Sequence, residues 1–302
     1  MSFRPLLLVV ACTLMACDAD NAANAGPERS RENVFTYRAP LGAGQTLALR
    51  NMSGRITVEP SADDTLRVAA DMTWRGDSTP PSDVSFRSDT KPDGVLVCAL
   101  VGEGRCTTDD YEVNSDGTGF SIGGGVRLGM GGSSQASVHF RVQVPTGVRL
   151  DLVMIDGNIV SASSAPVKAR GVNGDMTIVT SVGPVTAKTV NGAVDARMTT
   201  LAGSDTVEVE SVNGNVNAFL PESASINVEL RALNGSLLSD FPGLEAGSRR
   251  VNKAITGVIG TGTTPVRIRA INGNASLRRL DTQGRPFEIV PPPAEAEAPK
   301  AP

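Results

Sequence analysis

From about residue 147 to residue 280, and again near residue 50, apolar and polar residues alternate along the chain. Alternation with a period of two is typical of β-strands that bury one face and expose the other. The chain contains 32 glycines and 19 prolines, which favours many short elements joined by turns over long helices. The pattern therefore predicts an all-β fold.

An internal repeat organises this alternation. Each unit ends in an aliphatic residue, a short polar residue and a glycine, and an apolar residue follows two places later. The glycines of seven consecutive units are Gly157, Gly174, Gly192, Gly214, Gly235, Gly257 and Gly273, spaced 16 to 22 residues apart. An eighth unit surrounds Gly54. An insertion at about residues 59–145 separates it from the others.

The insertion is expected to carry strands of its own at residues 66–74, 94–101 and 137–144, together with a cysteine pair and a glycine-rich loop. We expect the insertion and the repeat to form one domain, at about residues 34–280.

Two architectures fit the repeat. Asn-Gly between alternating runs is a hairpin signal, which predicts an antiparallel meander or sandwich. However, each period holds two strand-sized runs with a second turn near its middle, which suits one coil of a β-solenoid. The aliphatic residues would then fill a narrow interior, and the asparagines would form a hydrogen-bonded column. We favour the solenoid.

The repeated aliphatic-Asn-Gly units resemble a known family. Together with the strand at 138–144, the Pro145-Thr146-Gly147-Val148 turn and the closing unit at 266–277, they look like the bacterial "putative adhesin" β-strand-repeat family. This is a domain of unknown function that is common in envelope proteins, and the resemblance covers about residues 35–280. It implies a β-helix-like fold and an envelope location, and it implies no catalytic or ligand-binding residue.

The N-terminus reads as a targeting segment. A short apolar stretch ends in Leu14-Met15-Ala16-Cys17, which resembles a bacterial lipobox. Cys12 also has a matching local pattern, but too few residues precede it. We expect a lipoprotein signal peptide at 1–16, lipidation of Cys17 and a flexible tether at 17–33. Residues 281–302 read as a disordered Pro/Ala/Glu-rich tail. These features place the protein in the bacterial cell envelope, at the periplasmic face or the cell surface.

Composition excludes several functions. Aromatic residues make up only 4% of the chain, which is few for a sugar-binding cleft or a nucleic-acid-binding face built on stacked rings. The net charge is −4 with no basic tail, so nucleic acid is not an expected partner. Cys98 and Cys106 flank a short segment and are expected to form a local disulfide after export.

No catalytic or metal site emerges. Residues 119–123 match a nucleophile-elbow pattern around Ser121, but that chemistry needs a following helix, and the glycine-rich segment after it cannot form one. The only histidine, His139, is expected on the solvent face of its strand with Arg141 and Gln143. One histidine excludes a multi-histidine metal site. Asp156, Asp175 and Asp195 fall in different columns of the repeat. We expect no cofactor.

Four places before the repeat glycines, six of eight residues are basic: Arg50, Arg170, Lys188, Arg231, Lys253 and Arg269. In a stack of coils about 4.8 Å apart these residues would form a ridge, and stacked like charges are unfavourable. Acids two places earlier, Asp151, Glu208 and Glu229, could neutralise the ridge. Alternatively, the ridge binds an anionic polymer such as an envelope polysaccharide, or lipid head groups.

The sequence thus predicts a non-enzymatic, lipid-anchored β-repeat protein that acts as a structural or adhesin-like interaction module. Its partners would be the membrane, through the anchor, and envelope polysaccharide or another envelope protein. The alternatives are an anionic-glycan binder that uses the ridge and a polysaccharide-cleaving β-helix enzyme.

Overall fold

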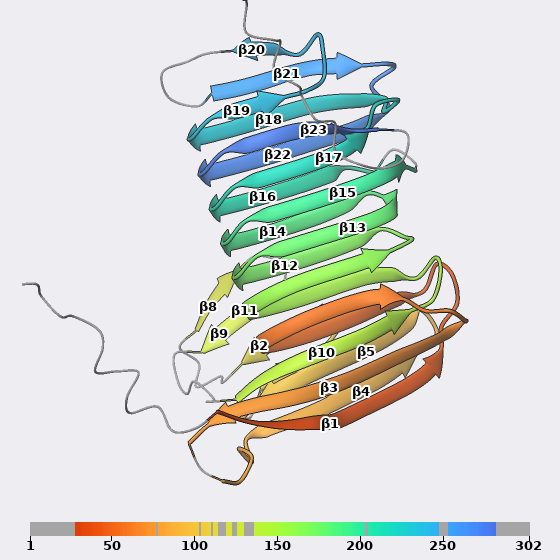
Figure 1. The fold of residues 1–302 in the computed structure, drawn as a ribbon, viewed down its shortest axis with the longest axis vertical. Coiled ribbons are helices and arrows are strands. Elements are labelled where there is room, and N and C mark those ends of the chain that lie inside the picture. Colours follow the sequence, from red (N-terminus) through yellow and green to blue (C-terminus); the bar gives the residue numbers. More distant parts are fainter. Residues whose placement is uncertain are drawn as a thin grey trace, which may run out of the picture.

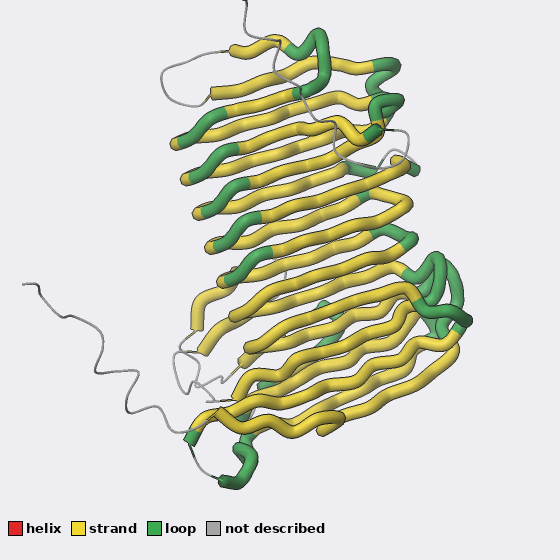
Figure 2. Tube along the Cα trace, viewed as in Figure 1, coloured by secondary structure: helices red, strands yellow, loops and turns green. Residues whose placement is uncertain are grey.

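The computed structural model describes residues 28–281 except for residues 77, 103, 110, 114–118, 123–125, 130–135, 203–204 and 248–252. Every regular element within these residues is a β-strand. The strands form a tall stack (Figure 1) that is joined by short turns at both edges (Figure 2). Nineteen strands form one sheet and four form a second. The predicted all-β class is confirmed.

The strands fall into three groups. The N-terminal group is β1 (Glu28–Pro40), β2 (Thr46–Pro60), β3 (Thr65–Arg75), β4 (Val84–Lys91), β5 (Gly94–Val101) and β10 (Ala136–Val144). The small sheet is β6 (Arg105–Cys106), β7 (Tyr111–Val113), β8 (Gly119–Ile122) and β9 (Val126–Gly129). The repeat group is β11 (Arg149–Ser163), β12 (Val167–Asn173), β13 (Met176–Gly183), β14 (Val185–Asn191), β15 (Val194–Leu201), β16 (Val207–Asn213), β17 (Val216–Pro221), β18 (Ile226–Asn234), β19 (Leu237–Ser239), β20 (Glu245–Gly247), β21 (Lys253–Ile259), β22 (Thr264–Asn272) and β23 (Ala275–Leu280).

Each coil consists of one strand before the Asn-Gly step and one after it. The strands before the step stack in parallel as β12, β14 and β16, and those after it as β13, β15 and β17. The long strands β2 and β11 run through the step, so they contribute to both stacks. We call the stack before the step face A and the stack after it face B. The parallel register confirms the solenoid and not a meander of repeat hairpins.

Aliphatic side chains fill the space between the two faces. Val185, Ala187, Val194 and Ala196 have no exposed area, and the same columns in neighbouring coils are equally buried. The alternation seen in the sequence places these residues inward because successive side chains of a strand point to opposite sides. The interior therefore accounts for the period of two.

The asparagines of the repeat form the expected column. Asn191 donates from Nδ2 to Oδ1 of Asn173 at 2.8 Å, and Asn213 donates to Asn191 at 2.8 Å. The series continues from Asn272 to Asn213 at 2.7 Å and from Asn234 to Asn272 at 2.8 Å. Every amide in this column donates in the same direction, which links the coils along the edge of the stack.

The coils do not stack in chain order. The last coil, β22 with β23, lies between the coil of β16 and β17 and the coil of β18 and β19. Figure 1 shows this as dark blue strands between lighter, earlier ones. In-register pairing depends on matching columns, which all of these coils share, so sequence order does not fix spatial order.

One predicted repeat unit is wrong. The unit at Gly257 lies on β21, which runs antiparallel to β18 and places Gly257 opposite Val228. Its two positions that should point inward are Arg250 and Asn252 in the sequence. Because these polar residue types cannot fill an aliphatic interior, the segment adds an antiparallel strand and not a coil.

The N-terminal end extends both faces. On face A, β5 pairs with β2, and β4 pairs with β5. On face B, β10 pairs with β2, and β3 and β1 follow it. The strands expected at 66–74, 94–101 and 137–144 are thus confirmed as β3, β5 and β10. Phe35 and Phe86 stack between the two faces with ring centroids 5.1 Å apart, and Phe140 meets Phe86 edge-on at 6.3 Å.

Strand β1 begins earlier than the domain start expected from the sequence. Residues 28–33, assigned to the tether, belong to β1, where Glu28 pairs with Arg75 of β3. A bulge between Arg31 and Phe35 shifts the register, and Asn33 adopts a positive φ of 50° there. The polar composition of this edge segment concealed its pairing.

Candidate functional site

The basic column lies on the outer side of face A. Strand pairing places Arg50, Val153, Arg170, Lys188, Glu210, Arg269 and Arg231 in register, in that order along the stack. Lys253 does not belong to this column, because β21 is antiparallel and sets Lys253 opposite Ala232. The predicted column therefore exists, but without Lys253.

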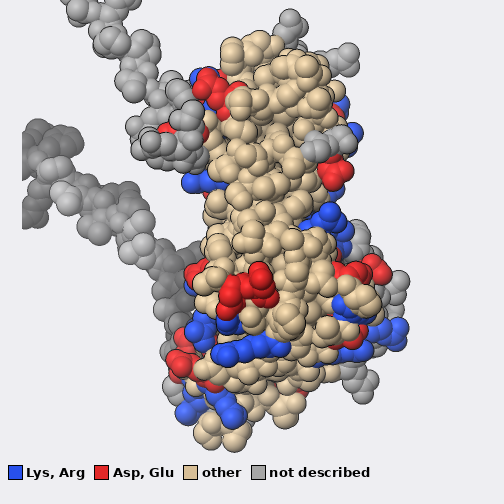
Figure 3. Space-filling view, turned by 90° about the vertical axis from the view of Figure 1, so that its right-hand side faces the viewer, with Lys and Arg blue, Asp and Glu red and all other residues tan. Residues whose placement is uncertain are grey.

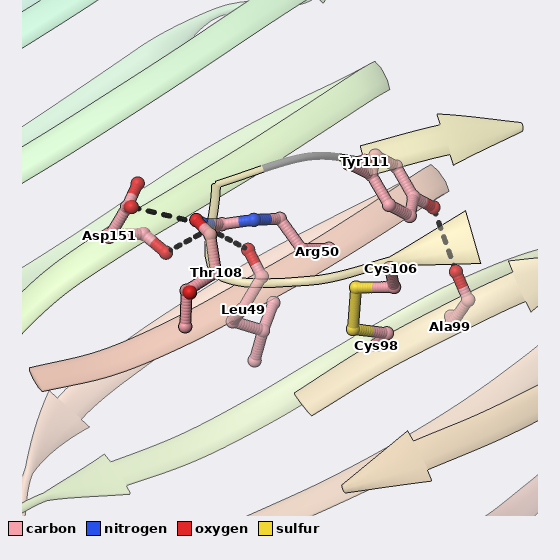
Figure 4. Close-up of a disulfide and its surroundings, with 8 residues drawn as sticks. All are labelled: Leu49, Arg50, Cys98, Ala99, Cys106, Thr108, Tyr111 and Asp151. Carbon is pink, nitrogen blue, oxygen red and sulfur yellow. Dashed lines mark hydrogen bonds and ion pairs between the residues drawn. A yellow bond between two sulfur atoms is a disulfide. The ribbon is translucent and has the colours of Figure 1, made fainter. Parts of the chain in front are cut away.

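Arg50 is not available to a ligand. Its side chain is only 1% exposed, and its guanidinium contacts the connection between β6 and β7 of the small sheet. The guanidinium donates to the Asp151 carbonyl at 2.6 Å, the Thr108 carbonyl at 2.7 Å and the Asp151 carboxylate at 2.9 Å (Figure 4). Burial lowers the pKa of Arg50, although Asp151 opposes this shift. Counting Arg50 as a surface anion-binding residue was wrong, because the insertion folds over β2.

The small sheet is held against face A beside Arg50. The expected disulfide joins Cys98 of β5 to Cys106 of β6. The buried Tyr111 hydroxyl donates to the Ala99 carbonyl at 2.8 Å (Figure 4), and burial raises the pKa of Tyr111. The disulfide and the Tyr111 hydrogen bond fix the small sheet to β5, and the Arg50–Thr108 hydrogen bond fixes it to β2.

The remaining basic residues of the column are paired with carboxylates. Arg170 Nη2 lies 3.0 Å from Asp151 Oδ1. Lys188 Nζ lies 2.7 Å from Glu208 Oε2 and 3.3 Å from Glu210 Oε2. Burial alone would lower the pKa of Lys188, but its two glutamate partners outweigh burial and raise it.

The same pairing continues toward the C-terminal coils. Arg269 lies 3.5 Å from both Glu210 and Glu229, and Arg231 also pairs with Glu229. The acids expected to neutralise the ridge therefore do so. A shallow groove of about 660 Å³ follows these coils, and its charged lining consists of Lys168, Arg170, Lys188 and Arg269 with Glu208 and Glu210.

His139 lies where the sequence places it. It faces outward from β10 with Arg141 and Gln143, while Phe140 and Val142 are buried. Its Nε2 lies 3.1 Å from the Thr73 hydroxyl. Burial and the neighbouring Arg55 lower the pKa of His139, and this outweighs the opposite influence of Asp71 and Glu28.

A second groove crosses the outer side of face B at the N-terminal end. It has a volume of about 640 Å³ and is built by β1, β3, β10 and β2. Four arginines line it: Arg38, Arg55, Arg67 and Arg141. Sequence reasoning missed this site, because three of its four strands, β1, β3 and β10, lie outside the regular repeat. Only the basic residues at outward positions of these strands could have signalled it.

Charge is unevenly distributed along the molecule. Seen from the edge that forms the right-hand side of Figure 1, charged side chains gather over the lower, N-terminal part, and the upper coils are mainly uncharged (Figure 3). The N-terminal end, and not the repeat, thus carries the stronger charge on this edge.

The candidate enzymatic residues do not converge. Ser121 lies on β8, which pairs antiparallel with β9, so strands β8 and β9 occupy part of the segment expected to be a glycine-rich loop. Residues 123–125 lie outside the described residues. Asp175 and Asp195 accept hydrogen bonds from Ala193 N and Asn217 Nδ2 of neighbouring coils. In the described part of the chain, no three His, Cys, Asp or Glu residues group as metal ligands would.

The predicted signal peptide, Cys17, most of the tether and the C-terminal tail after Asp281 lie outside the described residues. No helix long and apolar enough to cross a bilayer occurs among the residues that the structure describes.

Fold and surface together define a two-faced parallel β-solenoid with an inserted β-sheet. Residues 40–278 match the family described as Toastrack DUF4097, and the chain belongs to that family. Among solved structures, it is similar to a protein from Clostridium sporogenes described as a "putative cell adhesion protein". The identity is 13%, the coverage is 84% of this chain and 100% of that chain, and the TM-score is 0.43. No curated protein matches.

Proposed function

We propose that the protein is a non-enzymatic, adhesin-like interaction module that a lipid on Cys17 holds at the bacterial cell envelope. The observation that carries this proposal is the rigid in-register stack. Its coils share an aliphatic interior and an asparagine column, and its outer side chains stand in ordered columns. Such a rod offers an extended surface to a partner.

The use of the polar residues supports a non-enzymatic role. His139 contacts Thr73 on face B, Ser121 lies on the small sheet, and Asp175 and Asp195 link neighbouring coils. Nucleophilic or acid–base catalysis needs such groups within hydrogen-bond reach of one another. Here they instead belong to separate structural contacts.

The anchor is tested by cell fractionation and fatty-acid labelling of Cys17→Ser and, as a matched control, Cys12→Ser. We expect Cys17→Ser to lose the label and leave the membrane fraction, because the variant lacks the thiol that would carry diacylglycerol. Cys12→Ser should behave like the wild type. A labelled Cys17→Ser variant would contradict the proposed anchor.

The interaction role is tested by crosslinking in intact envelopes and recovery of the tagged chain. We expect a protein or polysaccharide of the envelope to be recovered with it in stable proportion. In parallel, incubation of the purified chain with envelope polysaccharides should release no new reducing ends. Release of such ends would identify an enzyme and overturn the proposal.

A further inference from the structure

The groove on face B has a small polar floor between longer side chains. Strand pairing sets Thr36, Ala69, Arg141 and Thr57 in one row across β1, β3, β10 and β2. The short side chains of Thr36, Ala69 and Thr57 line the groove in this row, and the longer side chain of Arg141 stands between Ala69 and Thr57. Hydroxyl groups on the floor of the groove can exchange hydrogen bonds with a polar ligand.

The rows on either side supply the charge. One row contains Arg38, Arg67, Gln143 and Glu59, and the other contains Asp71, His139 and Arg55. Arg67 pairs with Asp63 at 2.6 Å, and Arg141 pairs with Asp71 at 3.0 Å. Among the residues that the structure describes, no carboxylate forms an ion pair with Arg38 or Arg55.

The position of these two arginines is unfavourable without a further anion. Arg38 stands directly opposite Arg67 across β1 and β3, and like charges in that position destabilise a sheet. Arg55 stands beside His139 and lowers its pKa. One anionic group bound at each arginine would relieve the two contacts.

The spacing indicates a ligand with several charges. Arg38 on β1 and Arg55 on β2 lie three strand spacings apart, roughly 14 Å, and their rows are four residues apart along the strands, roughly 13 Å. Their Cα atoms are therefore roughly 20 Å apart, on opposite sides of the groove. A single small anion cannot contact both guanidinium groups. Among the described residues that line the groove, Phe140 is the only Phe, Tyr or Trp, and it is buried, so none of these three ring types is available in the groove for bases to stack on.

We propose that this groove binds a segment of an acidic glycan. Arg38 and Arg55 contact carboxylate groups on two of its sugars, while Thr36, Thr57 and Gln143 contact its hydroxyls. Glu59 lies at the rim and opposes binding. The inference rests on the proposed function, since it names a ligand class for the interaction module.

The test measures binding of the full-length chain to oligogalacturonate, to the neutral methyl ester of the same oligomer and to free galacturonate. We expect binding to the oligomer alone. Arg38→Gln with Arg55→Gln should weaken it about tenfold or more, because two charge-assisted contacts are lost. Glu59→Gln should strengthen it about twofold, because a repelling charge is removed.

The matched control is Arg231→Gln with Arg269→Gln, which removes the same charge from face A and should leave the affinity unchanged. Urea unfolding of each variant separates lost binding from lost folding.

Equal weakening by both double variants, no weakening by the groove variant, or no binding of the oligomer would overturn the inference. So would preferential binding to phosphatidylglycerol vesicles, which would identify a membrane surface. Loss of this inference with a partner still recovered by crosslinking leaves the proposed function standing.

Discussion

At the level of single residues, the repeat glycines are required by the closeness of neighbouring coils. Gly192 has a φ of +145°, and a Cβ on it would lie 2.1 Å from the carbonyl oxygen of Gly174. The asparagines before Gly174, Gly192, Gly214, Gly235 and Gly273 form the amide column, whereas the glycine allows the backbones to approach. The two residues of the step therefore have separate roles.

Gly192→Ala should lower the free energy of unfolding by at least about 2 kcal/mol, because both the backbone conformation and the contact with Gly174 become unfavourable. Urea unfolding followed by circular dichroism measures the change. Gly42→Ala is the matched control, since its Cβ would meet only Gln45 Oε1 at 3.5 Å. Equal stability of the two variants would show that the coils can move apart.

His139 predicts a pH dependence of stability. Burial and Arg55 lower its pKa below the usual 6.5, so the unfolded chain binds the proton more readily than the folded one. Above pH 6.5 His139 is neutral in both states, and its full contribution to the free energy of unfolding is present. That contribution is lost as the pH falls toward the folded-state pKa.

His139→Gln should reduce the loss of stability between about pH 7.5 and about pH 5.5, since it removes the group that titrates there. Asp71, Glu28 and Arg55 remain in the variant, so the comparison isolates the imidazole. The check is urea unfolding of both proteins at the two pH values. Parallel losses in both proteins would refute the assignment.

At the level of elements, the small sheet depends on a buried charge. Arg50 binds Asp151 of β11 and the Thr108 carbonyl before β7, so it connects the insertion to the solenoid. Arg50→Ala should cost about 3 kcal/mol, because it leaves buried partners without a donor. Arg231→Ala, at an exposed pair with Glu229, should cost less than about 1 kcal/mol.

Limited proteolysis extends this comparison. Cleavage between residues 104 and 129 should accelerate in Arg50→Ala and stay unchanged in Arg231→Ala. If Arg50→Ala resists protease as the wild type does, the disulfide and Tyr111 are sufficient to hold the insertion.

The sequence predicts strands better than it predicts their neighbours. Alternation located β3, β5 and β10, and the glycine column located the coils. The column also predicted one unit, at Gly257, that is not a coil. The burial of Arg50 could not be predicted from the sequence, because it depends on the insertion packing over β2. The groove around Arg38 and Arg55 was missed for a related reason, since the register of β1, β3 and β10 has no repeat to mark it.

At the level of the whole molecule, the position of the last coil predicts the effect of truncation. Removing residues 264–302 takes away β22 and β23, which lie between β16 and β18. Amide hydrogen exchange should then lose protection in β18 and β19 as well, while β12 and β14 keep theirs.

Removing only residues 291–302 is the control, because that segment consists of Pro, Ala, Glu and Lys and has no larger aliphatic or aromatic residue. Its exchange pattern should match that of the full chain. Persistent protection of β18 after the larger truncation would mean that β18 can pair directly with β16.

The intercalated coil also has a consequence for timing. The ribosome makes β18 and β19 before β22 and β23, yet the earlier pair can reach its final place only above the later one. Until about residue 280 has been synthesised, the growing rod ends in unpaired strand edges, which are templates for aggregation. Assembly therefore finishes with an internal closure, and a prematurely terminated chain exposes two open edges where the complete protein has none between these coils.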